Sequence, residues 1–252
     1  MIKIIMHGCN GRMGQVISSL VKEDPNMEIV AGIDILGQKG NPYPVFTSIK
    51  DCDIPADAVV DFASAEAIDD LLDTCIDKKL PVVICTTGLS DAQLEKVQKV
   101  SEQIPVLRSA NMSLGINLIE DVLRKISGFL NESGFDIEII EKHHNKKKDA
   151  PSGTALALAD AVNDGLKNKK DYIFDRSGRL QARSENELGI SAVRGGSIVG
   201  EHEIIFAGTD EVITIKHTAY SRAIFAKGAL SAAAFLAYAK PGMYDMSDVI
   251  AR

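Results

Sequence analysis

The segment MHGCNGRMGQ, residues 6–15, joins an apolar run at residues 2–7 to a pattern in which apolar residues recur at helical spacing over residues 13–21. Its glycines are Gly8, Gly11 and Gly14, and Asn10 stands where a G-x-G-x-x-G motif has its second glycine. A strand, a glycine-rich turn and a helix are the setting in which a helix N-terminus holds a dinucleotide pyrophosphate. Asn adopts positive φ more readily than most residues, so we expect the tight turn to be retained.

The rhythm of this segment continues through the first half of the chain. Apolar, strand-like runs at residues 27–34, 57–63, 81–88 and 104–112 alternate with helical patterns over about 65–79 and 90–102. Strands that are apolar along their whole length, separated by helices, indicate a parallel sheet covered on both faces. We therefore predict an α/β fold with a Rossmann-type, doubly wound parallel sheet.

The pattern changes after Asn111. A helix over about 113–130 leads to an alternating strand at 135–144 and a helix over about 153–167. After a polar segment at 175–189, three runs at 189–196, 202–208 and 211–219 look like antiparallel strands, and a small-residue helix at 221–239 closes the chain. This is an α+β pattern with a mixed or antiparallel sheet, and it places a domain boundary near Asn111.

Composition excludes several classes of protein. The net charge of -7 argues against a general nucleic-acid coat, which needs a broad basic surface. The four cysteines match no zinc spacing, so no metal site is expected. No window reaches the roughly 18 apolar residues of a membrane span, and the N-terminus lacks the apolar region of a signal peptide. We expect a cytoplasmic protein with reduced thiols.

Asp34 strengthens the dinucleotide interpretation. It ends the second predicted strand, 20 residues after Gly14, where an acid is expected to bind a ribose. An acid at this position repels a 2′-phosphate and mildly favours NADH over NADPH. Arg12 and Lys39 offer compensating charge, so the residues alone leave both cofactors open.

EKHHNKKKDAPSGTA, residues 141–155, is the only polar cluster with chemistry suited to a substrate. His143 can exchange a proton near neutral pH, Lys147 is a stronger cation, and the Ser152-Gly153-Thr154 step offers helix N-terminal amides and hydroxyls to a carboxylate. The alternative is a solvated basic loop before a helix cap, and the residues alone do not decide between the two. Satisfied structural roles are expected for His202 and His217, and a strand-end position near the nucleotide loop for His7.

Six segments carry a resemblance to a known family: GCNGRMG (8–14), CTTG (85–88), SANMSLGIN (109–117), EKHHNKKKDAPSGTAL (141–156), SAVRGGSIVGEHEIIFAG (191–208) and HTAYSRAIFAKGAL (217–230). In this order they closely resemble the 4-hydroxy-tetrahydrodipicolinate reductase (dihydrodipicolinate reductase) family over nearly the whole chain. The pattern H-H-x-x-K-x-D-A-P-S-G-T is the most specific of the motifs.

The resemblance implies a dinucleotide-binding domain at residues 1–112, completed by 221–252, and a substrate-binding and tetramerisation domain at residues 113–220. It implies an NAD(P)H-dependent reduction of a cyclic dicarboxylate, 4-hydroxy-tetrahydrodipicolinate, to tetrahydrodipicolinate with loss of water. This is a step of lysine and diaminopimelate biosynthesis. A homotetramer is implied, with no nucleic-acid or membrane partner.

The resemblance also implies roles for individual residues. His143 is the proton donor or acceptor and Lys147 the proton donor, while substrate is bound by His144, Ser152, Gly153 and Thr154. The cofactor-binding residues are Gly8, Cys9, Asn10, Gly11, Arg12, Met13, Asp34, Cys85, Thr86, Thr87, Ser109, Ala110, Asn111 and Met112. Two residues depart from the family pattern, Cys85 in place of the glycine of a GTTG turn and Asn10 in the phosphate loop.

Two other functions compete with this one. A related two-domain amino-acid dehydrogenase would oxidise free amino acids with NAD(P)+, but the HHNKKKDAPSGT span disfavours it. A regulator that senses NAD(H) and binds nucleic acid through residues 142–148 is disfavoured by the net charge of -7.

Overall fold

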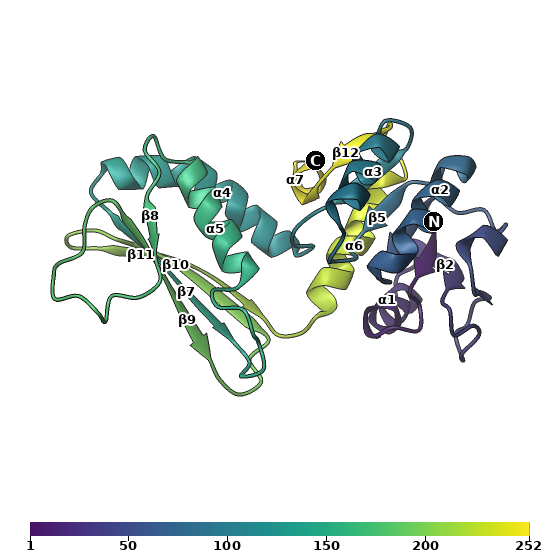
Figure 1. The fold of residues 1–252 in the computed structure, drawn as a ribbon, viewed down its shortest axis with the longest axis horizontal. Helices are drawn as coiled ribbons and strands as arrows, with labels where there is room; N and C mark the ends of the chain where they lie inside the picture. The colour runs from purple at the N-terminus through teal and green to yellow at the C-terminus, as the bar shows by residue number, and fades with distance from the viewer. Residues whose placement is uncertain (252) are drawn as a thin grey trace. The chain divides into compact units, whose positions relative to one another are not determined.

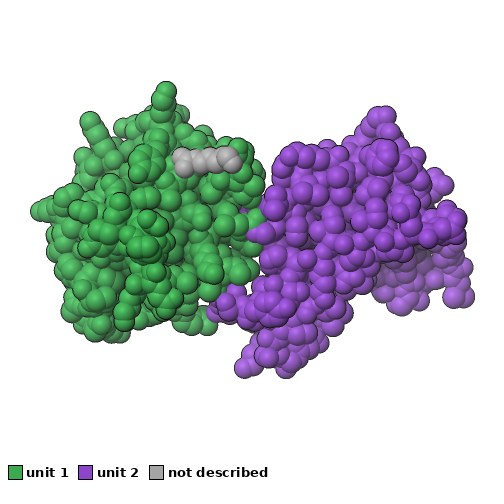
Figure 2. Space-filling view, turned by 180° about the vertical axis from the view of Figure 1, so that it is seen from behind, with its two compact units in different colours: residues 1–114, 223–252 green, residues 115–222 purple. Residues whose placement is uncertain are grey.

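The computed structural model of the chain describes residues 1–251, which form two sheets with their helices (Figure 1). The chain divides into two compact units (Figure 2): Met1–Leu114 with Ala223–Arg252, and Gly115–Arg222. None of the helices described is long and apolar enough to cross a membrane.

A seven-stranded sheet forms the centre of the first unit. Its strands are β1 (Ile2–His7), β2 (Met27–Ile33), β3 (Val45–Phe46), β4 (Ala58–Asp61), β5 (Val82–Ile84), β6 (Pro105–Arg108) and β12 (Gly242–Tyr244). All neighbours are parallel, in the order β12-β6-β5-β4-β1-β2-β3. The chain runs outward from β1 in both directions, which confirms the predicted doubly wound, Rossmann-type sheet.

Helices cover both faces of this sheet. They are α1 (Arg12–Lys22) and α6 (Ala223–Leu236) on one face, and α2 (Ile68–Lys78) and α3 (Asp91–Ser101) on the other. Successive strand residues point to opposite faces, so Ile4 packs in the core that contains α1 and α6, and Ile5 packs in the core that contains α2 and α3. Helix α3 begins with a capping box formed by Ser90 and Gln93.

The small residues of α6 allow close packing within the first unit. A Cβ atom added to Gly228 would lie 1.6 Å from the carbonyl oxygen of Met112, so no larger residue is accommodated there. Ala226, Ala229 and Ala233 are fully buried in the same core. Helix α6 therefore packs against the segment that follows β6. Two short 3-10 turns (Ile49–Asp51 and Ala65–Ala67) and helix α7 (Met246–Ile250) complete the unit.

The second unit contains a five-stranded sheet in the order β11-β10-β7-β9-β8. Its strands are β7 (Asp136–His143), β8 (Asp171–Ile173), β9 (Glu187–Arg194), β10 (Gly200–Ala207) and β11 (Val212–Ala219). β10 is antiparallel to β7 and β11, but β9 is parallel to β7 and β8. The sheet is thus mixed, and the expectation that all three late strands are antiparallel was wrong for β9. The connection that contains α5 returns the chain to the edge of the sheet at which β7 began. The strands that follow it therefore run in the same direction as β7.

Helices α4 (Leu114–Glu132) and α5 (Gly153–Asp164) pack on one face of this sheet. Alternation along β7 directs Ile137 and Ile139 into their shared core, together with Leu158 of α5. The same parity continues to Glu141 and His143, which places two polar side chains on the buried face at the end of the strand.

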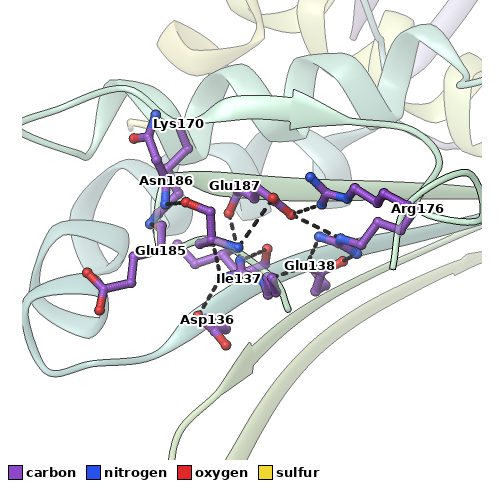
Figure 3. A network of polar contacts seen from close by, with 11 residues as sticks. Asp136, Ile137, Glu138, Lys170, Arg176, Glu185, Asn186 and Glu187 are labelled. Atoms are coloured by element: carbon purple, nitrogen blue, oxygen red, sulfur yellow. Dashed lines mark hydrogen bonds and ion pairs between the residues drawn. The ribbon is translucent and has the colours of Figure 1, made fainter. Parts of the chain in front are cut away.

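The polar segment before β9 is held by ion pairs rather than by apolar contacts (Figure 3). Arg176 donates to both carboxylate oxygens of Glu138 at 3.0 and 2.6 Å, and to Glu187 at 3.0 Å. Arg179 donates to Glu187 at 2.6 Å, and these arginine contacts lower the pKa of the Glu187 carboxyl to about 2. The network fixes this segment against β7 and β9.

Candidate active site

The turn between β1 and α1 has the geometry of a phosphate-binding turn. Gly8 has a φ of 80°, which L side chains rarely adopt, and a Cβ atom there would lie 2.7 Å from the carbonyl oxygen of Phe62. Gly11 is the N-cap of α1, and no side chain caps that end of the helix. The first amides of α1 are therefore available to an anion, and the helix dipole favours one there.

A cavity of about 680 Å³ opens at the carboxyl ends of β1, β2 and β4. Gly8, Gly11, Asp34, Phe62 and Ser64 are among its lining residues. It lies where the strand order reverses, between β1 and β4, which is where open α/β sheets bind ligands. The Asp34 carboxylate accepts hydrogen bonds from the backbone amides of Asn10 and Leu36, each at 3.0 Å. The position and size of the cavity suit the adenosine half of a dinucleotide.

Asn10 differs from the sequence expectation. Lys79 is the only non-glycine residue with positive φ among residues 1–251, so Asn10 does not supply the left-handed conformation of the turn; Gly8 does. The Asn10 side chain instead donates to the carbonyl oxygen of Gly37 at 2.9 Å and accepts from Asn41 at 2.8 Å. It ties the phosphate turn to the loop after β2.

The remaining predicted cofactor residues lie in three places in the first unit. Arg12 and Met13 begin α1, and Cys9 is buried in its core, where burial raises the pKa of the thiol to about 11. Cys85, Thr86 and Thr87 follow β5, and Ser109, Ala110, Asn111 and Met112 follow β6. Both loops begin at the carboxyl edge of the sheet, which is also the edge at which the cavity opens. Burial raises the pKa of the Cys85 thiol well above its ordinary value, which keeps that thiol neutral.

The pair formed by His7 and Asp61 was not predicted as part of this site. His7 was expected only at a strand end near the nucleotide turn, where it lies, and its Nδ1 atom is 2.7 Å from Asp61 Oδ1. His7 also lines the cavity. β1 and β4 pair these two residues in register, although they are 54 positions apart in the sequence.

His143 is the last residue of β7, and its side chain is only 10% exposed. Its Nδ1 atom lies 2.6 Å from Glu141 Oε2, and the Glu141 side chain is fully buried. Burial opposes the charged form of Glu141, but the hydrogen bonds from Arg194 and His143 outweigh it and lower the pKa of the carboxyl. A buried carboxylate therefore holds the proposed proton donor.

Lys147 follows in the loop after β7, and its amide donates to the His144 carbonyl oxygen at 3.1 Å. Its ammonium lies 2.9 Å from Asp149 Oδ2, and the side chain is 23% exposed. Lys146 and Lys148 are exposed, as expected for solvated neighbours, whereas His144 and Lys147 are partly buried. The three lysines of the triplet therefore differ in exposure, and Lys147 is the one that is partly buried.

Ser152 begins α5 in the way its sequence predicts. Its Oγ accepts a hydrogen bond from the Ala155 amide at 3.1 Å, so it is the N-cap, and Gly153 and Thr154 form the first turn of α5. Ser152 Oγ also lies 3.0 Å from His202 Nε2. A Cβ atom at Gly153 would meet nothing within 4 Å, so the space beside this helix end is open.

His202 and His217 were expected to be satisfied structural histidines, and this was wrong for one nitrogen of each. His202 Nδ1 and His217 Nδ1 are buried and have no hydrogen-bond partner within the described chain. Burial, followed by the nearby His143, lowers the pKa of His202 to about 4, so its ring is neutral at neutral pH. A buried N–H without a partner is rare. We therefore assign its hydrogen to Nε2, which leaves the Ser152 hydroxyl free to donate to a ligand.

Glu141 and Arg194 are the polar residues of this cluster that sequence reasoning missed. Arg194 donates to both oxygens of Glu141, at 2.7 and 2.6 Å. For Glu141 a signal was present, because an acid shared the alternation parity of the buried Ile137 and Ile139. Nothing local in the sequence indicated Arg194, which β9 brings beside β7.

Together, the doubly wound sheet with its phosphate turn and the buried His–Glu cluster of the second unit define a nicotinamide-dependent oxidoreductase.

The chain belongs to the dihydrodipicolinate reductase family. The sequence model of that family's N-terminus matches residues 2–112, and the model of its C-terminus matches residues 115–250. Together these ranges cover nearly the whole chain.

Relatives of known name agree with this membership. A 4-hydroxy-tetrahydrodipicolinate reductase of Caldanaerobacter subterraneus subsp. tengcongensis is 52% identical over 252 residues, covering 99% of this chain and 98% of its own length. The protein of that name from Clostridium novyi is 51% identical over 250 residues, with the same coverage. A solved structure of dipicolinate-bound dihydrodipicolinate reductase from Paenisporosarcina sp. TG-14 superposes with a TM-score of 0.80 at 25% identity, over 98% of this chain and 99% of that one.

Proposed function

We propose that this chain catalyses the NAD(P)H-dependent reduction of 4-hydroxy-tetrahydrodipicolinate to tetrahydrodipicolinate with loss of water, in lysine and diaminopimelate biosynthesis. In this reaction one hydride and one proton are added and one hydroxyl leaves as water. The relatives that are about half identical over the full chain carry the name of this activity.

One observation in the structure carries the proposal. His143, held by a buried carboxylate, and the open N-terminus of α5 at Ser152 belong to the same cluster, because Ser152 N donates to Glu141 Oε1 at 2.9 Å. A proton-transfer group and a carboxylate-binding helix end thus share one anchor. A dicarboxylate that must be protonated as it is reduced requires both.

The chain's own residues have separate roles in this proposal. The Ser152 hydroxyl, the amides of Gly153 and Thr154, and His144 bind a substrate carboxylate. His143 Nε2 exchanges a proton with the substrate, and Lys147 Nζ donates one. The bound nicotinamide supplies the hydride.

The cofactor would be held by the first unit. The amides at the start of α1 would bind the pyrophosphate, and Gly8 would let the backbone approach it. Asp34 accepts from the ribose hydroxyls through the lone pairs that its two backbone contacts leave open. The loops after β5 and β6, at residues 85–87 and 109–112, hold the nicotinamide half.

A coupled assay tests the function directly. A synthase that makes the labile substrate from pyruvate and aspartate semialdehyde is mixed with this protein, and loss of absorbance at 340 nm is followed with NADH and with NADPH. We expect loss that depends on both coupling substrates. No such loss with either cofactor contradicts the proposal, and NAD+ reduction with free amino acids would support a dehydrogenase instead.

NADH is the proposed preferred cofactor. The residues that line the cavity include the acids Asp34, Glu66 and Asp70 and, within residues 1–251, no lysine or arginine. The Lys50 ammonium lies 2.7 Å from Asp70 and compensates that acid, but the lining still carries more negative than positive charge, which disfavours a 2′-phosphate. A tenfold preference corresponds to only about 1.4 kcal/mol. We expect kcat/KM for NADH to exceed that for NADPH by at least about tenfold.

Asp34→Asn tests this cause of the preference, because it removes the charge and keeps the size of the side chain. The ratio of the two kcat/KM values should move toward NADPH. Lys39→Ala is the control: Lys39 is exposed and does not line the cavity, so the ratio should be unchanged. A wild-type protein that uses NADPH better than NADH would contradict the expectation.

A homotetramer built through the second sheet is the assembly that we propose. Three apolar side chains of β9 and β11 support an interface on this sheet because they are exposed in the isolated chain: Val193, Val212 and Ile213. Light scattering on the protein used for the assay measures the assembly.

A further inference from the structure

We infer that the buried pair Glu141–Arg194 positions both proton-transfer groups of this site. Glu141 sets the tautomer and direction of the His143 ring, and Arg194 joins that carboxylate to the loop that carries Lys147. The inference rests on the function proposed above, and it assigns roles to two residues outside the pattern H-H-x-x-K-x-D-A-P-S-G-T.

The Glu141 carboxylate leaves His143 one neutral tautomer. An ionised carboxylate only accepts hydrogen bonds, so the hydrogen in the 2.6 Å contact belongs to His143 Nδ1. Nε2 is then the atom that gains and loses a proton. A Cβ atom at Gly200 would lie 3.1 Å from Nε2, so the glycine at the start of β10 leaves room beside that atom.

Each oxygen of Glu141 has two partners. Oε2 accepts from His143 and from Arg194 Nη1, whereas Oε1 accepts from Ser152 N and from Arg194 Nη2. The guanidinium compensates the buried charge and fixes the plane of the carboxylate, which in turn fixes the His143 ring. The same carboxylate orients the start of α5 through Ser152.

Arg194 also reaches the Lys147 loop. Its Nη2 donates to the carbonyl oxygen of Asp149 at 2.7 Å, and the Asp149 side chain pairs with Lys147 at 2.9 Å. One guanidinium is therefore in contact with Glu141 and with the residue that holds Lys147. Lys in its place would keep the charge but lose the bidentate fork.

The same strand provides a matched control. Glu138 also lies on β7, and Arg176 binds both of its oxygens (Figure 3). By the alternation of the strand it is on the opposite face of the sheet from His143. Glu141→Gln therefore weakens the pair with Arg194, and Glu138→Gln weakens the pairs of Glu138 with Arg176 and Arg183. Only the first changes the partner of His143.

The experiment measures kcat, KM and the downfield proton NMR spectrum of wild type, Glu141→Gln, Arg194→Lys and Glu138→Gln. An imidazole N–H that donates to a carboxylate over a short distance gives a far-downfield resonance. His143→Asn identifies the signal of His143 among the five histidines of the chain.

We expect Glu141→Gln to lower kcat about 100-fold with little change in KM, which is at the low end of what a positioned proton-transfer group contributes. Its His143 resonance should disappear. Arg194→Lys should lower kcat less and retain the resonance with a shift. Glu138→Gln should retain both the resonance and wild-type kcat, although its melting temperature falls.

The inference is overturned by a wild-type kcat in Glu141→Gln, by a His143 resonance that survives in it, or by an equal loss of kcat in Glu138→Gln. If Glu141→Gln does not fold, the intermediate kcat of Arg194→Lys provides the test. A wild-type kcat in His143→Asn would contradict the role proposed for His143. In that case, loss of the His143 resonance in Glu141→Gln would still establish the contact that positions His143. Failure of the proposed function and failure of this inference are therefore distinguishable.

Discussion

Replacing His143 by Ala is expected to lower kcat by about 10³-fold, within the range of 10² to 10⁴ that general acid–base catalysis supplies. The physical reason is that the Nε2 atom, whose direction is set by the 2.6 Å contact of Nδ1 with Glu141, is lost. The proposed nucleotide site lies in the first unit and His143 in the second, so the dissociation constant for NADH should change little. Steady-state kinetics and a titration of NADH binding measure the two quantities.

His144→Ala is the matched control for this variant. The neighbouring histidine is proposed to bind a substrate carboxylate, so its loss should raise KM more than it lowers kcat. Equal losses of kcat and of NADH affinity in His143→Ala would instead give His143 a role at the cofactor or in the fold.

Lys147→Ala is expected to lower kcat by a similar factor, about 10³-fold. The Lys147 side chain is 23% exposed, and its ammonium lies 2.9 Å from Asp149 Oδ2, which holds it in place before substrate binds. Its removal takes away the proposed proton donor and a positive charge together. The coupled assay gives kcat and KM for the variant.

Lys147→Arg separates these two contributions. Arginine retains the charge but does not give up a proton in proteins, so KM should approach the wild-type value while kcat stays low. Lys146→Ala and Lys148→Ala should both retain wild-type kcat, because these side chains are exposed. Recovery of kcat in Lys147→Arg would show that charge alone is required.

Much of the first unit could be predicted because its signals are local. The apolar run 2–7, the glycine turn and Asp34 are recognisable without any partner, and the longer strands and helices of the unit followed from periodicity. Strands β3 and β12 and helix α7, like β8 of the second unit, contain only two to five residues, and no period was detected in them. The direction of β9 was mistaken because a strand's own residues do not specify whether its neighbour is parallel.

The candidate site also contains features that depend on local sequence and features that depend on the tertiary structure. The sequence by itself determined the doubly wound half of the fold and gathered His143, Lys147 and Ser152 into one stretch, because these features depend on spacing along the chain. Only the tertiary structure paired Arg194 with Glu141, 53 positions away, and His202 with Ser152, 50 positions away. Those contacts follow from the strand order β10-β7-β9, which places residues from three distant strands side by side on one buried face. A buried charge needs a partner, and strand order alone decides which residue is close enough to be that partner.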